Sequence, residues 1–214
     1  MNVNVINNAP DRVHVYAKST IGSADSLTVI IDPKNPRDYI KLRDVAGGNT
    51  FQNDCGAFIA LEHFSDGTTA VIQKDITKKM KFGENNDWRE SEIRKDLNSE
   101  YLEKLNRAFG ADNIIEHKVD LLSLDGLDDY GISTDKVSLL TIDQYRKYRL
   151  TLGDNLDSWW WLATPDSTPN GVGAGGARFV DSSGLVNYCG CGWDDFGVRP
   201  FLILKSDILV SCEK

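Results

Sequence analysis

Trp159-Trp160-Trp161-Leu162-Ala163-Thr164-Pro165 is the first of two apolar stretches that decide the fold, and Gly197-Val198-Arg199-Pro200-Phe201-Leu202-Ile203-Leu204 is the second. Both read as strands, because they are strongly apolar and contain aromatic and β-branched residues. The segment between them, residues 166–196, contains no Lys, Glu, Gln or Met. Its small, polar and aromatic residues disfavour helix and are those that binding surfaces use. The pattern predicts two frame strands that hold a binding surface.

Eight side chains of this segment are predicted to contact a ligand, because they are chemically varied and lie between the frame strands. They are Asn170, Arg178, Ser183, Asn187, Tyr188, Trp193, Asp195 and Phe196. Most of the binding energy is expected from the three aromatic residues of the set. At least two of the consecutive Trp159, Trp160 and Trp161 are expected in the core, because neighbouring residues of a strand face opposite ways. Arg199 is expected to be a buried structural residue with an acidic or carbonyl partner.

Composition and charge limit the class of protein. The chain has 214 residues, 41% of them hydrophobic, which is enough for one domain with a core of its own and a small appendage. A net charge of −8 and a pI near 4.9 argue against nucleic acid and against an anionic membrane as partners. No apolar run is long enough to insert into a membrane. The partner expected for the binding surface is a protein or a glycan on a cell surface.

The cysteines predict a reducing compartment. Cys55, Cys189, Cys191 and Cys212 have no disulfide spacing, and together with three scattered histidines they show no zinc spacing. The N-terminus lacks the basic start and apolar core of a secretory signal. We therefore expect free thiols, no metal, no cofactor and synthesis in a cytoplasm. A virion or a cell surface stays open as the final location.

The N-terminal part of the chain reads as strands. Residues 13–16 alternate, residues 27–31 are β-branched, and residues 58–72 have the pattern of a hairpin with a turn at Ser65-Asp66-Gly67-Thr68. We expect residues 1–50 to be a β-rich segment for attachment or oligomerisation and residues 51–214 to form the ligand-binding domain. A homo-oligomer is compatible with this division.

Two helices are predicted. The first spans residues 87–109, with Asp87 and Glu90 as a capping box, an apolar residue every fourth position from Ile93 to Phe109, and Gly110 as its end. The second begins at Thr141, where Gln144 completes a capping box, and ends near Arg149. Between them, residues 118–123 are expected to form a strand and residues 125–129 a solvated acidic turn.

An ordered set of motifs carries a family resemblance. Four motifs occur in a familiar order: Asn85-Asn86-Asp87-Trp88-Arg89-Glu90-Ser91-Glu92-Ile93-Arg94-Lys95-Asp96-Leu97-Asn98, residues 136–141, the Trp159 stretch and Gly197-Val198-Arg199-Pro200. The chain resembles an uncharacterised domain family of gut bacteria and their phages. That family is similar to the C-type-lectin-fold variable proteins of diversity-generating retroelements and, more distantly, to formylglycine-generating enzymes. The resemblance covers roughly residues 55–206, and Ala163-Thr164 departs from the usual Arg-Ser, so no role of that Arg is carried over.

The resemblance implies an α+β, C-type-lectin-like fold with two helices flanking small antiparallel sheets. It also implies a diversifiable surface in residues 166–196, as in a retroelement-diversified phage receptor-binding protein or bacterial adhesin. Adenine mutagenesis of asparagine codons never yields Lys, Glu, Gln, Met or Trp, and residues 178–196 obey this rule except at Trp193. A Gly-rich loop that avoids long side chains explains the composition equally well.

Three other interpretations compete with a binding protein. Trp193-Asp194-Asp195 resembles part of a lectin calcium element, but its partner Glu-Pro-Asn element is missing, so no metal is predicted. Cys189 and Cys191 lie in the region where a formylglycine-type oxidase has its cysteine pair. Their spacing differs from that of the enzyme's pair, and no His or Asp constellation supports a general base. The chain is therefore expected not to be an enzyme. A virion or assembly structural protein, with the same face as an oligomer interface, is the alternative that stays open.

Overall fold

The computed structural model describes residues 2–9, 12–18, 27–31 and 38–212. The chain divides into two units: residues 1–39 with 211–214, and residues 40–210. In the first unit, β1 (Asn2–Ala9), β2 (Arg12–Lys18) and β3 (Leu27–Ile31) form an antiparallel three-stranded sheet in that order. The strands predicted at residues 13–16 and 27–31 are therefore confirmed, and a role in attachment stays a prediction.

The second unit is built around a large curled sheet. Its strands are β4 (Asp38–Lys41), β5 (Thr50–Asn53), β6 (Gly56–His63), β7 (Thr68–Gln73), β9 (Ile114–Ile115), β12 (Val137–Ser138), β17 (Phe201–Lys205) and β18 (Leu209–Cys212). Their order is β12-β17-β7-β6-β5-β18-β4, and β9 also pairs with β17. The predicted hairpin is confirmed as β6–β7, with an irregular register between Ala60 and Glu62. The second apolar stretch of the sequence supplies β17, which lies between β12 and β7.

A smaller five-stranded sheet carries the segment between the two apolar stretches. It consists of β8 (Lys78–Lys79), β13 (Trp160–Pro165), β14 (Gly176–Val180), β15 (Val186–Gly190) and β16 (Gly197–Val198), in the order β15-β14-β13-β16-β8. The first apolar stretch is thus the central strand β13, and β15 is an edge strand. A separate pair, β10 (His117–Asp120) and β11 (Ile132–Asp135), is antiparallel. Of the strand predicted at residues 118–123, only the part up to Asp120 forms.

The first predicted helix exists but is interrupted. It consists of α1 (Glu92–Asp96), a π-helical turn over Leu97–Tyr101, and α2 (Leu102–Phe109), closed by Gly110 at φ 85°. The π turn coincides with Asn98, whose amide donates to the Val137 carbonyl of β12 at 2.8 Å and accepts from its N–H at 3.2 Å. The Asn98 side chain therefore pairs with β12 as a backbone peptide group would. These two hydrogen bonds lie at the π turn, where the helix is locally wider.

The predicted capping box of this helix is wrong. Asp87 caps a separate 3₁₀ turn, Trp88–Glu90, by accepting from the backbone N–H of Arg89. The backbone is extended at Ser91, and the Ser91 hydroxyl caps α1 by accepting from the N–H of Arg94 at 3.0 Å. Other 3₁₀ turns lie at Leu42–Asp44 and Ala111–Asn113. A Ser directly before a helical stretch satisfies an otherwise unbonded N–H, so the helix starts there.

The second helix, α3 (Ile142–Tyr148), begins as predicted. Thr141 accepts from the Gln144 N–H at 3.3 Å, and the Gln144 side chain accepts from the Thr141 N–H at 2.9 Å, which completes the capping box. Within the described residues, no helix combines the length and the apolarity that crossing a bilayer requires.

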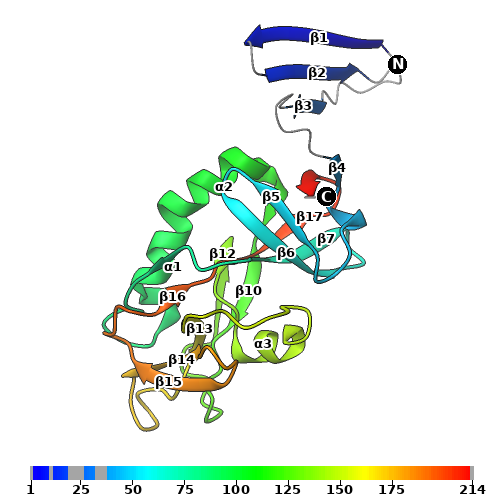
Figure 1. The fold of residues 1–214 in the computed structure, drawn as a ribbon. Coiled ribbons are helices and arrows are strands. Elements are labelled where there is room, and N and C mark those ends of the chain that lie inside the picture. The colour runs from blue at the N-terminus through cyan, green and yellow to red at the C-terminus, as the bar shows by residue number, and fades with distance from the viewer. Residues whose placement is uncertain (1, 10–11, 19–26, 32–37, 213–214) are drawn as a thin grey trace. The chain divides into compact units, whose positions relative to one another are not determined.

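The helices cover opposite faces of the large sheet (Figure 1). Phe58 of β6 packs edge-on against Phe109 of α2, with ring centroids 5.4 Å apart. The next residue, Ile59, points to the other face, where it belongs to a core with Tyr145 of α3 and with Trp160 of β13. The protein therefore has the predicted α+β class, with antiparallel sheets predominating and helices packed on them.

A second core is rich in aromatic rings and lies on the other face of β13. We call Phe82, Trp88, Trp161, Phe179 and Phe196 the aromatic cluster. Trp161 stacks on Phe196 at 4.3 Å between centroids and meets Phe82 edge-on at 5.7 Å. Its indole N–H donates to the Met80 carbonyl at 3.0 Å, so the buried polar atom is satisfied. Trp160 and Trp161 are both buried, which confirms that at least two of the three tryptophans are core residues.

Candidate functional site

The candidate binding segment, residues 166–196, folds as the β14–β15 hairpin with a loop on each side. Five cross-strand pairs join the two strands, from Gly176 opposite Gly190 to Val180 opposite Val186. Arg178 lies directly opposite Tyr188. Hydrogen bonds from Cys191 N–H to the Gly175 carbonyl and from Asp181 N–H to the Leu185 carbonyl flank the hairpin. The alternation of an antiparallel ladder then makes Arg178 and Tyr188 a non-hydrogen-bonded pair, in which side chains approach most closely.

Two large aromatic side chains are exposed on one face of this hairpin. Tyr188 and Trp193 are each 63% exposed. A Cβ on Gly176 would lie 3.3 Å from the Tyr188 ring, and one on Gly190 would lie 3.5 Å from the Trp193 ring. Since Gly176 and Gly190 are cross-strand partners, both rings cover positions that carry no side chain. We call Arg178, Tyr188 and Trp193 the aromatic surface.

Arg178 is held beside Tyr188 by an ion pair. Its guanidinium pairs with Asp166, the residue that follows β13, and lies 5.5 Å from the centroid of the Tyr188 ring. Both charged side chains are largely buried, with 13% of Arg178 and 20% of Asp166 exposed. A partly desolvated ion pair and cation–π contact fix the arginine more firmly than surface contacts do. The sequence did not single out Asp166, because only the β13–β14 pairing brings it to Arg178.

Ser183 lies in the turn of the hairpin, and Asn187 lies on β15 opposite Phe179. Both are exposed, and both donate to the carboxylate of Asp181, from the Ser183 hydroxyl at 2.6 Å and from the Asn187 amide at 3.1 Å. The backbone N–H groups of Ser183 and Leu185 donate to the same carboxylate. These donors, the Ser183 hydroxyl first, lower the pKa of Asp181. Asp181 therefore organises the turn, and the two predicted contact residues are tied to it.

Asn170 lies in the loop before β14, which is bound to the acidic loop. Its backbone N–H donates to Asp129 at 3.3 Å, and the Asp125 carboxylate accepts from the Ser167 hydroxyl at 2.6 Å. The solvated turn predicted at residues 125–129 is confirmed, since its carboxylates are exposed, and two of them also accept hydrogen bonds from the neighbouring loop. Asn170 itself is exposed.

Asp195 is exposed and forms an ion pair with Lys79 of β8 at 2.7 Å. Phe196 contradicts its prediction as a contact residue, because it is 3% exposed and stacked in the aromatic cluster. It directly precedes β16, which lies beside β13 in the interior of the sheet, and this position turns its ring inward. The remaining seven predicted residues are accessible to differing degrees, and their contact with a ligand stays a prediction.

Arg199 has the predicted structural role. It is 2% exposed, and it donates from Nε to the Gln73 carbonyl and from Nη2 to the Lys74 carbonyl, each at 2.9 Å. Its guanidinium also lies 5.2 Å from the Trp160 ring centroid. Arg199 thus ties the end of β7 to the segment between β16 and β17.

The four cysteines are free, as predicted. Cys191 is buried, and burial together with the neighbouring Cys189 raises its pKa to about 12. A thiol with such a pKa stays protonated at neutral pH, whereas soft metals bind the thiolate. Among the described residues, no group of three or more His, Cys, Asp or Glu side chains is placed to hold a metal ion.

Comparison with known proteins assigns the chain to a family. Residues 66–206 match the family described as Domain of unknown function (DUF6273). The chain belongs to this family. The DUF6273 match includes β13, the β14–β15 hairpin and β17, so both frame strands and the aromatic surface lie within it. Neither a curated protein nor a solved structure matches the chain significantly.

Proposed function

We propose that this DUF6273 protein is a ligand-binding protein that recognises a protein or a glycan on a cell surface through its aromatic surface. The observation that carries the proposal is the exposure of Tyr188 and Trp193 over paired glycines of the β14–β15 hairpin. Exposed aromatic rings offer a large contact area at a small cost in side-chain entropy, which is why binding sites are enriched in them. The proposed activity is binding and not catalysis.

The rigidity of the surface supports this proposal. β14 lies between β15 and β13 in the sheet, and Phe179 of β14 packs edge-on against Trp161 and Phe196 in the aromatic cluster. The Arg178–Asp166 ion pair fixes one edge of the surface. A preorganised surface loses little freedom when a ligand binds, so more of the contact energy appears as affinity.

We further propose a C-type-lectin-like arrangement and a diversifiable role for residues 166–196, as in a phage receptor-binding protein or a bacterial adhesin made in a cytoplasm and placed on a virion or cell surface. In support, the hairpin lies in a sheet whose central strand is the first apolar stretch, and helices pack on the sheets. A nearby reverse-transcriptase gene with an imperfect copy of the coding segment, differing at adenines, is the expected finding. A genomic neighbourhood without either contradicts diversification but leaves the binding proposal intact.

The binding proposal is tested with a double variant. Tyr188→Ala with Trp193→Ala is compared with wild type on a glycan array and on intact bacterial cells, with retained circular dichroism as the folding check. Each aromatic truncation is expected to weaken binding by about 2 kcal/mol if the residue is a hot spot. The matched control is Ile132→Ala with Leu150→Ala, which removes two exposed apolar side chains outside the hairpin. Equal binding by wild type and the aromatic double variant refutes the proposed site.

A second candidate function, an oligomer interface, is favoured by the open edge of β15. The ladder geometry directs the N–H and C=O of Tyr188 away from β14, and β15 carries neither a charge nor a proline to discourage pairing. If β15 pairs with a second copy, light scattering gives a dimer mass for wild type and a monomer mass for Tyr188→Pro, which removes the outward N–H. A monomeric wild type at high concentration excludes this candidate.

A further inference from the structure

A groove lies between the first helix and the turn that joins β5 to β6. Its helical wall runs from Asp96 through the π turn to Ala108, and its other wall consists of residues 54–55 and 76–78. Figure 1 shows α2 beside β5. The groove has about 650 Å³ of free volume, and small-molecule sites hold roughly 300–1,000 Å³. We call this space the helix groove.

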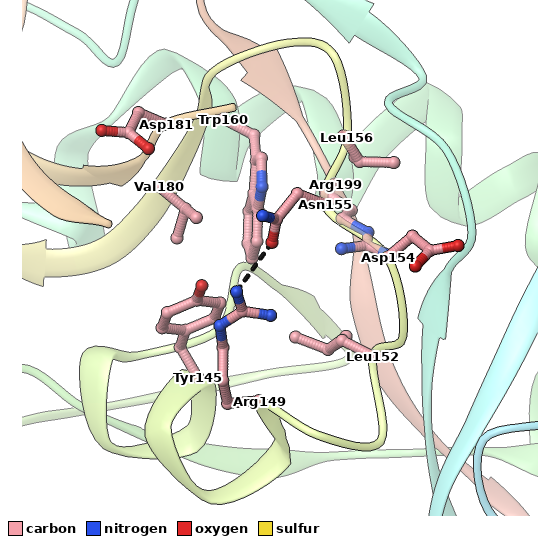
Figure 2. A pocket seen from close by; sticks show the side chains of 10 residues that line it. All are labelled: Tyr145, Arg149, Leu152, Asp154, Asn155, Leu156, Trp160, Val180, Asp181 and Arg199. Carbon is pink, nitrogen blue, oxygen red and sulfur yellow. Dashed lines mark hydrogen bonds between the residues drawn. The ribbon is translucent and has the colours of Figure 1, made fainter. Parts of the chain in front are cut away.

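A second hollow, beside Trp160, has no room for a ligand. Figure 2 shows it among Tyr145, Trp160 and Arg199, and its free volume of about 10 Å³ holds one water molecule at most. Tyr145 and Trp160 also belong to the core between α3 and the large sheet. A ligand of several atoms therefore fits the helix groove and not this hollow.

The floor of the helix groove offers hydrogen bonds to a peptide group. Gln73 lines the groove and is only 6% exposed. Its amide nitrogen donates to the Cys55 carbonyl at 3.2 Å, and its amide oxygen accepts from the Tyr101 hydroxyl at 2.8 Å. An amide nitrogen carries two N–H donors, and a phenolic oxygen that donates can also accept. One donor of Gln73 and the acceptor of Tyr101 are therefore left for a ligand.

The charged side chains of the groove are segregated along the helix. Asp96 and Glu100 line its first half, and Lys104 and Arg107 line its second half. Lys78, on the opposite wall, forms an ion pair with Asp96. Glu100 forms no ion pair with any described residue. Two carboxylates against one ammonium give this end of the groove a net negative charge.

The other end of the groove has a net positive charge. The pKa of the Cys55 thiol is raised by burial and then by Asp54, and Lys104 and Arg107 partly offset this rise. The four groups therefore lie near one another. Neither Lys104 nor Arg107 forms an ion pair within the described part of the chain. Two cations against one carboxylate leave this end positive, so the groove is neutral in sum but polarised along the helix.

The separation of the two charged ends matches the length of a short peptide. A helix rises about 1.5 Å per residue, so Asp96 and Arg107 are roughly 15 Å apart along its axis. An extended chain of four residues is about 13 Å long. A dianion or a diamine of this length would place a like charge at one end of the groove, whereas a zwitterion meets an opposite charge at both ends.

We propose that the helix groove binds a short peptide with free ends, its carboxylate at Lys104 and Arg107 and its ammonium at Glu100. A peptide group of the ligand donates to the Tyr101 oxygen or accepts from the Gln73 amide. The site is separate from the aromatic surface, since none of its lining residues belongs to the β14–β15 hairpin. It adds a second ligand to the recognition of a cell surface proposed above.

The test is an NMR titration of the full chain at pH 7 with tetraalanine as the probe. Saturable shifts of the Gln73 side-chain amide signal are expected. N-acetylation or C-terminal amidation of the probe should each weaken binding about threefold to fivefold, as the loss of one partly exposed ion pair does, and both together about tenfold. The absence of saturable tetraalanine binding, equal binding of the doubly blocked peptide, or tighter binding of glutarate or putrescine overturns the proposal.

Variants assign each end of the peptide. Lys104→Gln with Arg107→Gln should weaken tetraalanine binding and remove the difference in affinity between tetraalanine and its amide. Glu100→Gln should reduce the effect of N-acetylation. Glu103→Gln, at an exposed position of the same helix that does not line the groove, is the matched control and should change neither. A folded Lys104→Gln, Arg107→Gln variant that still discriminates against the amide refutes the site. The double variant that lacks both rings of the aromatic surface should bind tetraalanine as wild type does, so the two sites are tested independently.

Discussion

Tyr188 and Phe196 come from the same small-residue segment, yet one is 63% exposed and the other 3%. Tyr188 lies on β15, an edge strand, whereas Phe196 leads into β16, which lies next to the central strand β13. Ring size is nearly equal at the two positions, although Tyr188 also carries a polar hydroxyl. The place of each strand in the sheet therefore decides whether an aromatic residue of this segment serves the core or the surface.

The largest expected effect is the difference in stability between variants of a buried and an exposed tryptophan. Trp161→Ala should destabilise the protein by about 3–5 kcal/mol, because it leaves a cavity in the aromatic cluster. Trp193→Ala, the same change at an exposed position, should cost less than about 1 kcal/mol. Urea unfolding of both variants measures the difference. Equal losses would show that the cluster and the surface are not energetically distinct.

The next effect concerns pH. Burial lowers the pKa of His117 to about 4, and His117 donates to or accepts from the Ser138 hydroxyl at 2.8 Å. The unfolded chain, with a histidine pKa near 6.5, then binds more protons than the folded one, so stability is full above pH 6.5 and falls as the pH drops toward 4. The loss should approach about 3 kcal/mol, at roughly 1.4 kcal/mol per pKa unit.

A non-titrating variant isolates this contribution. In His117→Gln, the denaturation midpoint should change less between pH 7 and pH 4.5 than in wild type. The same slope in both proteins would rule out His117 as the source. The affinity of the exposed hairpin for its ligand should not change with the protonation of His117.

A smaller loss of stability is expected when the hydrogen bonds that Asn86 makes with the loop before β14 are removed. Asn86 is fully buried and donates to the Ser167 and Gly176 carbonyls at 2.9 and 2.7 Å, while accepting from the Tyr130 hydroxyl at 2.8 Å. Asn86→Ala leaves these groups unsatisfied and should cost about 2 kcal/mol in thermal or urea unfolding. Asn187→Ala, which removes an exposed amide of the hairpin, is the matched control and should be nearly neutral. Equal losses of stability in the two variants would mean that the exposed Asn187 amide contributes as much to folding as the buried Asn86 amide.

The smallest expected effect lies within the aromatic surface. Tyr188→Ala should cost about 0.5–1 kcal/mol, because the Arg178 guanidinium loses its cation–π partner. A double-mutant cycle with Arg178→Gln should give a coupling of similar size. A coupling near zero would show that the arginine is placed by Asp166 alone.

Several elements followed from the sequence because their signals are local. The Thr141–Gln144 capping box, the β6–β7 hairpin, the burial of at least two of the three consecutive tryptophans and the burial of Arg199 are examples. The interrupted helix did not follow, because the bond between Asn98 and β12 joins residues far apart in the chain. For the same reason the sequence identifies neither Asp166 as the partner of Arg178 nor Asp125 and Asp129 as acceptors for a distant loop.

The sequence by itself determined that two apolar stretches become strands and that the segment between them is rich in small and aromatic residues, because strand propensity and composition act over a few neighbouring residues. Only the tertiary structure decided which of those aromatic rings point outward. Strand order depends on pairings between distant residues, and that order leaves β15 at an edge with Tyr188 exposed while it encloses Phe196 beside β13.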